Sequence, residues 1–385
     1  MKLDEAGEVE VACWPAPLVD HATSIAATAS IPARIEWSES MSEDNTLVST
    51  ASRAAEASGY DAARRGAAFF DRADRAFIVV SGKDRGPYLH GLLTNDVASL
   101  KAGEGCYAAY LTPQGRMIAD LWVYELGDVI LLVMSRDVKD AVLTKLDQFI
   151  FTEDVQLGDV SSTFACVAIV GPGAATVTTQ VLKGVPLETL ASLGEHGNVR
   201  AEFASVAAIV ARVTDTGEPG YDLFVETAQS ESLKAALRAK GATELDAPTI
   251  ETLRIEAGMP KFHRDMDEDT IPLEAGIESR AISLTKGCYV GQEVIIRVLH
   301  RGHGRVARRL VGLTLDGDAI PRPAAAVRSG DREIGHVTSS VRSPALQRPV
   351  ALAYVHRDFV AEGTHVTVDG TPATVTALPF VPRQF

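Results

Sequence analysis

Residues 105–135, GCYAAYLTPQGRMIADLWVYELGDVILLVMS, contain three apolar segments separated by two turn signals. In the first two segments apolar and polar residues alternate, which is the pattern of β-strands with one buried face. The sequence PQGR (113–116) between them is typical of a hairpin turn, and Gly127-Asp128 precedes the third segment. These residues therefore predict three consecutive strands, of which the first two form a hairpin.

Helical patterns are interleaved with the strand patterns on both sides of this stretch. Residues 83–93 predict a short helix, and residues 138–150 carry apolar residues at helical spacing. A similar order of patterns returns between about residues 163 and 258, which predicts a second, related unit. Because hairpins occur among the helices, the order indicates an α+β fold rather than a doubly wound parallel sheet. The other predicted elements are strands at 76–82, 164–171, 206–213 and 220–226, and helices at 173–182 and 230–241.

From Arg308 onward, short segments rich in Val, Leu and Thr are separated by Gly, Pro and Asp turns. This spacing predicts an antiparallel barrel or sandwich of about six strands. The predicted fold is thus α+β, with two related α+β subdomains followed by a C-terminal antiparallel β-barrel. We expect four parts: a low-order acidic leader (1–58), the two subdomains (59–160 and 161–304) and the barrel (305–385).

Composition excludes several classes of protein. The chain has 385 residues, 46% of them hydrophobic and 23% charged, which is typical of a well-packed globular protein. No apolar run reaches the roughly 18 residues that a membrane span needs, and the acidic N-terminal residues do not resemble a targeting signal. We therefore expect a cytoplasmic protein. The net charge of −14 argues against broad binding to duplex nucleic acid, although five arginines between Arg297 and Arg309 predict an anion-binding strip.

The sequence does not predict a metal site. Residues 265–269, DMDED, resemble the start of a calcium loop, but the glycine and glutamate that the loop requires later are absent. His300 and His303 lie among arginines, whose charge disfavours a metal ion. The four cysteines form no C-x-x-C pair, so neither a disulfide scaffold nor a structural zinc site is indicated.

One cysteine is a candidate for a chemical role. Cys288 lies between Gly287 and Gly291, which allow tight turns, and the ammonium group of Lys286 would favour a thiolate. A loop cysteine without a role is the alternative. Cys106 and Cys166 lie in apolar segments, where packing is the simpler explanation, and nothing distinguishes Cys13.

The sequence KGCYVGQE (286–293) resembles the signature of the YgfZ folate-binding proteins, which are relatives of the glycine-cleavage T-protein, an aminomethyltransferase. The resemblance extends over about residues 60–385 and includes LLTNDVASL (92–100), TGEPGYDLFVE (216–226) and LRIEAGMP (253–260). Two features favour the YgfZ group over the transferases. Residues 249–251 are Thr-Ile-Glu where the transferases have Ala-Arg-Asp, and the transferases lack a cysteine at position 288.

The resemblance implies two α+β units and a barrel around a central cavity that holds tetrahydrofolate or a one-carbon derivative. It places Asp96 beside the reactive pterin nitrogens and Glu218 or Asp222 on the pterin ring, because carboxylates accept paired N–H donors. Asn95-Asp96 as a simple turn after a helix is the alternative. The predicted site also includes Arg254 and Arg297 as folate ligands, and Cys288, Lys286 and Asp96 as catalytic groups, with Asp96 assisting the transfer electrostatically.

Three functions follow from these residues. The first is a folate-binding protein of iron–sulfur cluster biogenesis or repair and tRNA modification, with folate and iron–sulfur assembly or client proteins as partners. The second is an aminomethyltransferase that transfers a one-carbon unit to tetrahydrofolate. The third is an RNA- or protein-interaction module with a vestigial folate site, although the basic strip lacks aromatic residues for base stacking. Whether the protein is an enzyme stays open; if it is, we expect a tetrahydrofolate-dependent one-carbon transferase.

Overall fold

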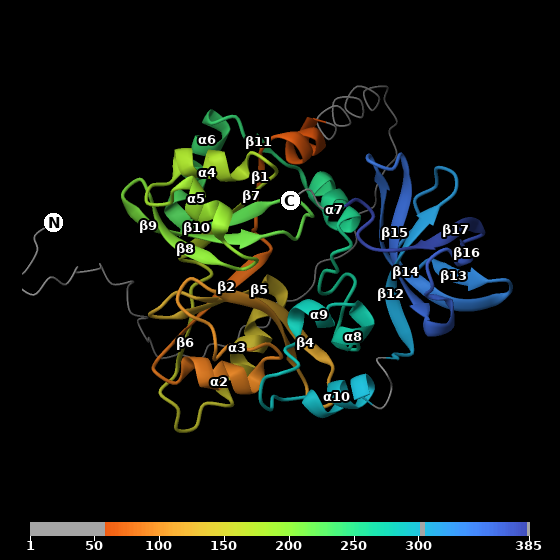
Figure 1. Cartoon of the computed structure of the whole chain (residues 1–385), viewed down its shortest axis with the longest axis horizontal. Helices are drawn as coiled ribbons and strands as arrows, with labels where there is room; N and C mark the ends of the chain where they lie inside the picture. The colour runs from red at the N-terminus through yellow and green to blue at the C-terminus, as the bar shows by residue number, and fades with distance from the viewer. Residues whose placement is uncertain (1–57, 301–304, 383–385) are drawn as a thin grey trace, which may run out of the picture. The chain divides into compact units, whose positions relative to one another are not determined.

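The computed structural model describes residues 58–300 and 305–382 (Figure 1). The predicted leader therefore lies, apart from its last residue, outside the described residues. Cys13, Arg301 and His303 also lie outside them. In the described part of the chain, the structure contains two β-sheets, a closed barrel and a group of short helices between the second sheet and the barrel in sequence. The predicted α+β fold with a C-terminal barrel is confirmed.

The first sheet has the strand order β3-β4-β5-β2-β6. The predicted hairpin is present: β3 and β4 pair antiparallel, with Tyr107 opposite Trp122. Gly115 in its turn has a φ of +75°, a conformation that glycine adopts without strain. The buried Val142 and Leu146 of α3 cover this sheet. The elements are β2 (Arg75–Ser81), α2 (Arg85–Leu92), β3 (Gly105–Leu111), β4 (Met117–Glu125), β5 (Ile130–Ser135), α3 (Lys139–Asp147) and β6 (Gln156–Asp159).

The second sheet has the order β11-β1-β7-β10-β9-β8. Its strand β1 (Ala68–Asp71) precedes the first sheet in sequence, yet it pairs with β7 and β11. The chain therefore crosses from one sheet to the other at residues 72–74, between β1 and β2. The other elements are β7 (Phe164–Val170), α4 (Ala174–Val181), α5 (Leu187–Ser192), β8 (Asn198–Phe203), β9 (Val206–Val213), β10 (Gly220–Glu226), α6 (Ser230–Ala239) and β11 (Thr243–Glu244).

The two sheets contact each other through aromatic side chains. Phe77 of β2 and Phe224 of β10 meet edge to face with their ring centroids 5.7 Å apart, and Tyr124 of β4 contacts Phe224 at 6.0 Å. All three rings are buried. Such edge-to-face pairs stabilise a core beyond the area that they bury. Because the second sheet covers one face of β4, the side chains on both of its faces are buried, and its sequence alternates only in part.

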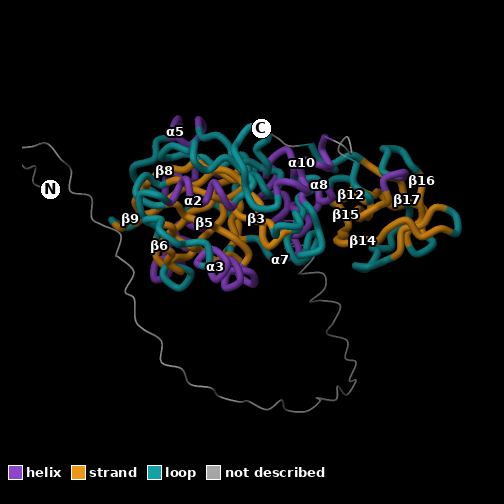
Figure 2. Tube along the Cα trace, turned by 90° about the horizontal axis from the view of Figure 1, so that it is seen from below, coloured by secondary structure: helices purple, strands orange, loops and turns teal. Residues whose placement is uncertain are grey.

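The barrel is closed, with the strand order β12-β15-β14-β13-β16-β17. Its interior consists mainly of Val, Leu and Ala side chains. Closure distinguishes a barrel from the sandwich that the sequence also allowed, because it leaves no strand edge unpaired. The strands are β12 (Arg308–Leu315), β13 (Ala326–Ser329), β14 (Arg332–Ser343), β15 (Arg348–His356), β16 (His365–Val368) and β17 (Thr371–Thr376). Figure 2 shows the barrel strands from a second direction.

Residues 254–309 appear irregular in sequence because they form several short helices. The helix α7 (Ala247–Glu256) is capped at its N-terminal end by Asp246, whose side chain accepts a hydrogen bond from the N–H of Thr249, and it has a proline in its first turn. Three helices follow, and Gly276, with a φ of +72°, ends the first of them. They are α8 (Pro272–Ala275), α9 (Glu278–Ala281) and α10 (Gln292–His300).

Candidate functional site

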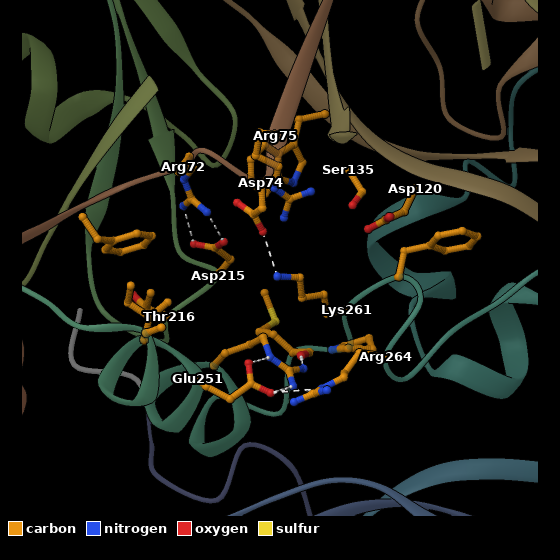
Figure 3. A pocket seen from close by; sticks show the side chains of 18 of the residues that line it. Arg72, Asp74, Arg75, Asp120, Ser135, Asp215, Thr216, Glu251, Lys261 and Arg264 are labelled. Carbon is orange, nitrogen blue, oxygen red and sulfur yellow. Dashed lines mark hydrogen bonds and ion pairs between the residues drawn. The ribbon is translucent and has the colours of Figure 1, made fainter. Parts of the chain in front are cut away.

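A cavity of about 580 Å³ lies where the two sheets and α7 meet (Figure 3). The crossing at residues 72–74, the inner residues of β3 and β4, and α7 supply most of its lining. Its volume lies within the range of pockets that hold small organic ligands. No barrel residue is among those that line this cavity in the described part of the chain. This cavity lies between the two α+β units and the helices that follow them, whereas the resemblance implied a cavity that the barrel also surrounds.

One wall of the cavity carries the carboxyl group of Asp120. Asp120 and Trp122 lie two residues apart on β4, so both side chains point to the same face of the sheet. The Tyr107 hydroxyl donates a hydrogen bond to one Asp120 oxygen over 2.8 Å, and the other oxygen is buried without a partner. The sequence prediction did not include Asp120. The available signal was an acid inside the apolar strand MIADLWV.

The crossing between the sheets supplies the opposite wall. Arg72 is buried and donates to both oxygens of Asp215 at 2.9 Å, and to Asp222 at 2.5 Å. Asp74 pairs with Lys261 at 2.7 Å. Burial alone would raise the pKa of Asp74, but the charges of Arg75 and Lys261 lower it below its usual value. The cavity is therefore lined by many charged groups, most of which are neutralised by a neighbour.

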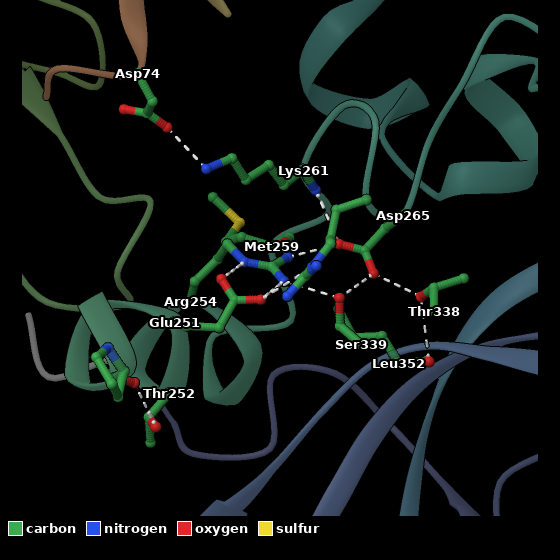
Figure 4. Close-up of polar contacts among 12 residues, drawn as sticks. Asp74, Glu251, Thr252, Arg254, Met259, Lys261, Asp265, Thr338, Ser339 and Leu352 are labelled. Atoms are coloured by element: carbon green, nitrogen blue, oxygen red, sulfur yellow. Dashed lines mark hydrogen bonds and ion pairs between the residues drawn. The ribbon is translucent and has the colours of Figure 1, made fainter. Parts of the chain in front are cut away.

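Arg254 lines the cavity, but its donors are bound to protein groups (Figure 4). It donates to Glu251 at 2.6 and 2.9 Å, to Asp265 at 2.6 Å and to the Met259 carbonyl at 2.5 Å. It also reaches the barrel through Ser339 at 2.9 Å. The structure therefore places Arg254, a predicted folate ligand, as a link between α7, the loop that follows it and the barrel.

Glu218 and Asp222 are fully buried and do not belong to the cavity lining. Glu218 pairs with Arg64, and burial raises its pKa above the usual value, with Glu256 adding to the effect. Asp222 pairs with Arg72, which lines the cavity, so Asp222 lies behind a lining residue. Burial, opposed by Arg72, raises the pKa of Asp222 to about 6. Of these two residues, Asp222 reaches the cavity indirectly, through the arginine that it holds.

Asp96, Lys286 and Cys288 all lie outside the cavity lining, and Asp96 is close enough to Lys286 to act on its charge. Asp96 follows α2 and pairs with His90 of that helix at 3.1 Å. The Lys286 ammonium donates to the carbonyls of Leu93 and Asn95 at 2.7 and 3.0 Å, beyond the C-terminal end of α2. Burial lowers the pKa of Lys286 to about 8.

Gly291 lets the KGCYVGQE loop pack against the β3–β4 turn, and the cysteine of this loop lies at the surface. Gly291 has a φ of +85°, and a Cβ atom there would lie 2.5 Å from the Thr112 carbonyl oxygen, so only glycine fits against the β3–β4 turn. Cys288 is exposed, as the sequence predicts, whereas Cys166 is buried. Burial raises the pKa of Cys106 to about 12. Among the described cysteines Cys288 is thus the exposed one, and Cys106 has intermediate exposure.

The predicted arginine strip does not form one surface with the cavity. Arg297 is exposed on α10 and is not among the lining residues. Arg308 pairs with Glu274 at 3.3 Å and Arg309 with Glu278 at 2.8 Å. The anion-binding role of this strip stays a prediction. Within residues 58–300 and 305–382, no three His, Cys, Asp or Glu side chains are grouped so that they could hold a metal ion.

The fold and site define an α+β protein with a ligand-sized cavity between two sheets and a closed C-terminal barrel. The chain belongs to the glycine cleavage T-protein family. Residues 24–286 match the GCVT N-terminal domain, and residues 308–382 match the glycine cleavage T-protein C-terminal barrel domain. This confirms the predicted resemblance at the level of the family. The finer YgfZ-type assignment rests on the residues of the KGCYVGQE motif.

Curated relatives cover most of the chain. It is 33% identical over 328 residues to an aminomethyltransferase of Rubrobacter xylanophilus, with 84% of this chain and 86% of that protein aligned. It is also 33% identical over 334 residues to an aminomethyltransferase of Streptomyces avermitilis, with 84% and 88% aligned. The crystal structure of the glycine cleavage system aminomethyltransferase T from Bartonella henselae has the same fold, with a TM-score of 0.77 at 24% identity over 86% of this chain and 90% of that one.

Among the described residues, no helix is both long enough and apolar enough to cross a membrane.

Proposed function

We propose that the cavity binds a tetrahydrofolate and that the protein transfers a one-carbon unit to it, as an aminomethyltransferase does. The observation that carries this proposal is Asp120, a buried carboxyl group in the cavity wall with one oxygen free of protein partners. The family and the names of the curated relatives support the same reaction class. This places the second of the three predicted functions ahead of the YgfZ-type role.

The lining groups fit a reduced folate. A pterin ring presents adjacent N–H donors, and a carboxylate is the side chain that accepts such a pair best. Besides Asp120, the cavity lining contains two buried atoms without protein partners, Nε of Arg75 and Oγ1 of Thr216. Buried polar atoms normally have hydrogen-bond partners, so these three atoms are the groups that a polar ligand would satisfy.

Asp120 would also act on the reaction itself. When a carbon passes from an aminomethyl group to a folate nitrogen, positive charge develops on the carbon and the nitrogens bound to it. A carboxylate held close to that charge stabilises it without having to reorganise. The Tyr107 hydroxyl fixes the orientation of Asp120, and Arg254 acts as a positioning residue that holds α7 beside the cavity. We assign to Asp120 the role that the sequence gave to Asp96.

Two asparagine variants test this assignment. Asp120→Asn removes the acceptor charge inside the cavity, and Asp96→Asn is the matched change outside it. Loss of a charged hydrogen bond to the ligand costs about 1.5–3 kcal/mol, so Asp120→Asn should weaken tetrahydrofolate binding roughly 10- to 100-fold. Asp96→Asn should bind like the parent. Calorimetric titration measures the tetrahydrofolate affinity of both variants, and a glycine-cleavage assay with the lipoyl carrier protein measures their activity. If Asp96→Asn weakens binding and Asp120→Asn does not, the folate site lies at Asp96.

A second candidate function is supported by the exposed thiol of Cys288. This residue lies in the KGCYVGQE motif, and Ile250 stands where the transferases have arginine. Both features favour the YgfZ-type role in iron–sulfur cluster maintenance and tRNA modification. The test is complementation of a host that lacks its own YgfZ homologue. If Cys288→Ser is soluble, binds folate and fails to restore iron–sulfur enzyme activity while Cys106→Ser succeeds, the YgfZ-type role gains over the transferase.

A further inference from the structure

The charges that line the cavity can be sorted by their partners. Arg72 is neutralised by Asp215, and Lys261 by Asp74. Asp71, at the end of β1, pairs with Lys234 of α6 at 3.3 Å. Arg254 and Arg264 both contact Glu251, Arg264 at 3.7 Å. These groups attract a charged ligand only weakly, because each of them already has an opposite charge within contact distance.

Three lining charges remain outside these ion pairs in the part of the chain that the structure describes: Asp120, Arg75 and Arg280. Asp120 accepts a hydrogen bond only from the neutral Tyr107 hydroxyl. Arg75 has a buried Nε without a hydrogen-bond partner. The cavity thus presents two guanidinium groups and one carboxyl group that form no ion pair with a protein group, although the charge of Arg75 also acts on Asp74. This surplus of positive charge favours a ligand with negative charge of its own.

Aromatic rings hold both guanidinium groups in place. Arg75 lies over the Trp122 ring at 4.3 Å, and Arg280 over the Tyr107 ring at 5.2 Å. Tyr107 and Trp122 are directly opposite each other on β3 and β4. An arginine stacked on a ring keeps the N–H groups along its edge available for a planar acceptor. Burial and Asp120 raise the pKa of Tyr107, whereas Arg280 and Arg75 oppose that rise, so both charges lie close to the same hydroxyl.

We infer that Arg75 and Arg280 bind a carboxylate of the ligand inside the cavity, beside Asp120. This inference rests on the proposed function and deepens it. Asp120 accepts hydrogen bonds from the N–H donors of the pterin, and the two arginines bind the acidic p-aminobenzoylglutamate half of the same ligand. A guanidinium binds a carboxylate through two parallel hydrogen bonds, and burial strengthens such a pair. The alternative is that the arginines bind the neutral carbonyl oxygen of the pterin.

The two halves of the ligand separate these possibilities. The probes are p-aminobenzoylglutamate, which has the carboxylates without the pterin, and 6-methyltetrahydropterin, which has the pterin without the carboxylates. We expect Arg75→Met and Arg280→Met each to weaken p-aminobenzoylglutamate binding about tenfold or more, and to leave 6-methyltetrahydropterin binding unchanged. Asp120→Asn should show the opposite pattern. Arg75→Lys keeps the charge but loses the planar guanidinium group. Its affinity for p-aminobenzoylglutamate should lie between those of the parent and Arg75→Met.

Arg328→Met is the matched control, because Arg328 is an exposed barrel arginine paired with Glu333 and lies outside the cavity. Thermal unfolding of each variant checks that it is folded. If the parent protein does not bind p-aminobenzoylglutamate, or if Arg75→Met and Arg280→Met weaken the pterin probe as much as the acidic one, the inference is wrong. Failure of the parent to bind tetrahydrofolate or 6-methyltetrahydropterin would instead overturn the proposed function, and the acidic probe would still test the arginines.

Discussion

Asp222 shows how the cavity depends on a residue that does not line it. Its side chain is fully buried between the two sheets, and one of its oxygens has no hydrogen-bond partner. It shares Arg72 with Asp215, so a single guanidinium serves two carboxyl groups. Burial raises the pKa of Asp215 as well, but Arg72 outweighs this effect and lowers it. The two acids therefore differ in their affinity for protons although they have the same partner.

This environment predicts a pH-dependent stability. The pKa of Asp222 is about 6 in the folded protein and near 3.8 when it is unfolded, so the folded state binds the proton more tightly. The resulting stabilisation is complete below about pH 4 and is lost as the pH rises through 6. Between pH 4 and 7 the free energy of unfolding of the parent should fall relative to Asp222→Asn by about 2 kcal/mol. Urea denaturation of both proteins across this range measures the difference, and parallel curves would contradict it.

At the scale of elements, α7 connects the cavity to the barrel. Its residues Glu251 and Arg254 line the cavity, and Arg254 reaches Ser339 of β14. The fully buried Glu256 at its C-terminal end accepts hydrogen bonds from Tyr60 at 2.6 Å and from Ser343 of the barrel. Any change that loosens this helix should therefore reach both the cavity and the barrel.

The N-terminal cap of α7 offers a mild test. The Asp246 carboxyl accepts the N–H of Thr249 at 2.9 Å, so Asp246→Ala leaves that donor without its partner. We expect a loss of about 1 kcal/mol in stability and faster hydrogen exchange in the first turn of α7. Asp246→Ser, which can still cap the helix, is the control and should retain most of the stability. Equal stability of the parent and Asp246→Ala would show that this cap contributes nothing.

At the scale of the whole described molecule, a buried ion cluster joins segments that are far apart in sequence. Arg64 pairs with Glu218 and Glu256, whose side chains are fully buried, and its Nε donates to Tyr60 at 3.1 Å. The cluster includes residues from the helical segment 58–65, from the turn between β9 and β10, and from α7, and Glu256 extends it to the barrel. Removing the one cation from such a cluster leaves buried carboxylates uncompensated, which is far more costly than losing a surface pair.

Arg64→Met should therefore destabilise the protein by about 3–5 kcal/mol. The double variant Arg64→Met/Glu218→Gln should recover part of this loss, because one uncompensated carboxylate is then neutral. Denaturant unfolding gives the free energies, and hydrogen exchange in β10 and β15 reports whether the second sheet and the barrel are destabilised together. A double variant that is less stable than Arg64→Met would contradict the electrostatic explanation. If hydrogen-exchange protection is lost in only one of these two strands, the cluster does not couple the second sheet to the barrel.

The sequence alone determined many of the strands and helices, and the family. The alternation in residues 105–125, the turn at 113–116 and the short segments after Arg308 predicted the hairpin and the barrel, because periodicity reports which side of a strand is buried. The KGCYVGQE motif, with the other matching blocks, indicated the T-protein family, and the glycines around Cys288 predicted an exposed thiol.

Only the tertiary structure decided which residues share a site. The strand β1 belongs to the second sheet, so the chain crosses between sheets at residues 72–74 and brings Arg72 and Arg75 to the cavity. Asp120 lines the cavity, whereas Asp96 pairs with His90 elsewhere. Local sequence cannot show this, because the partner of a charged side chain is set by the packing of strands distant in sequence. An acid in an apolar strand has the same local pattern whether it faces an arginine, another sheet or a cavity.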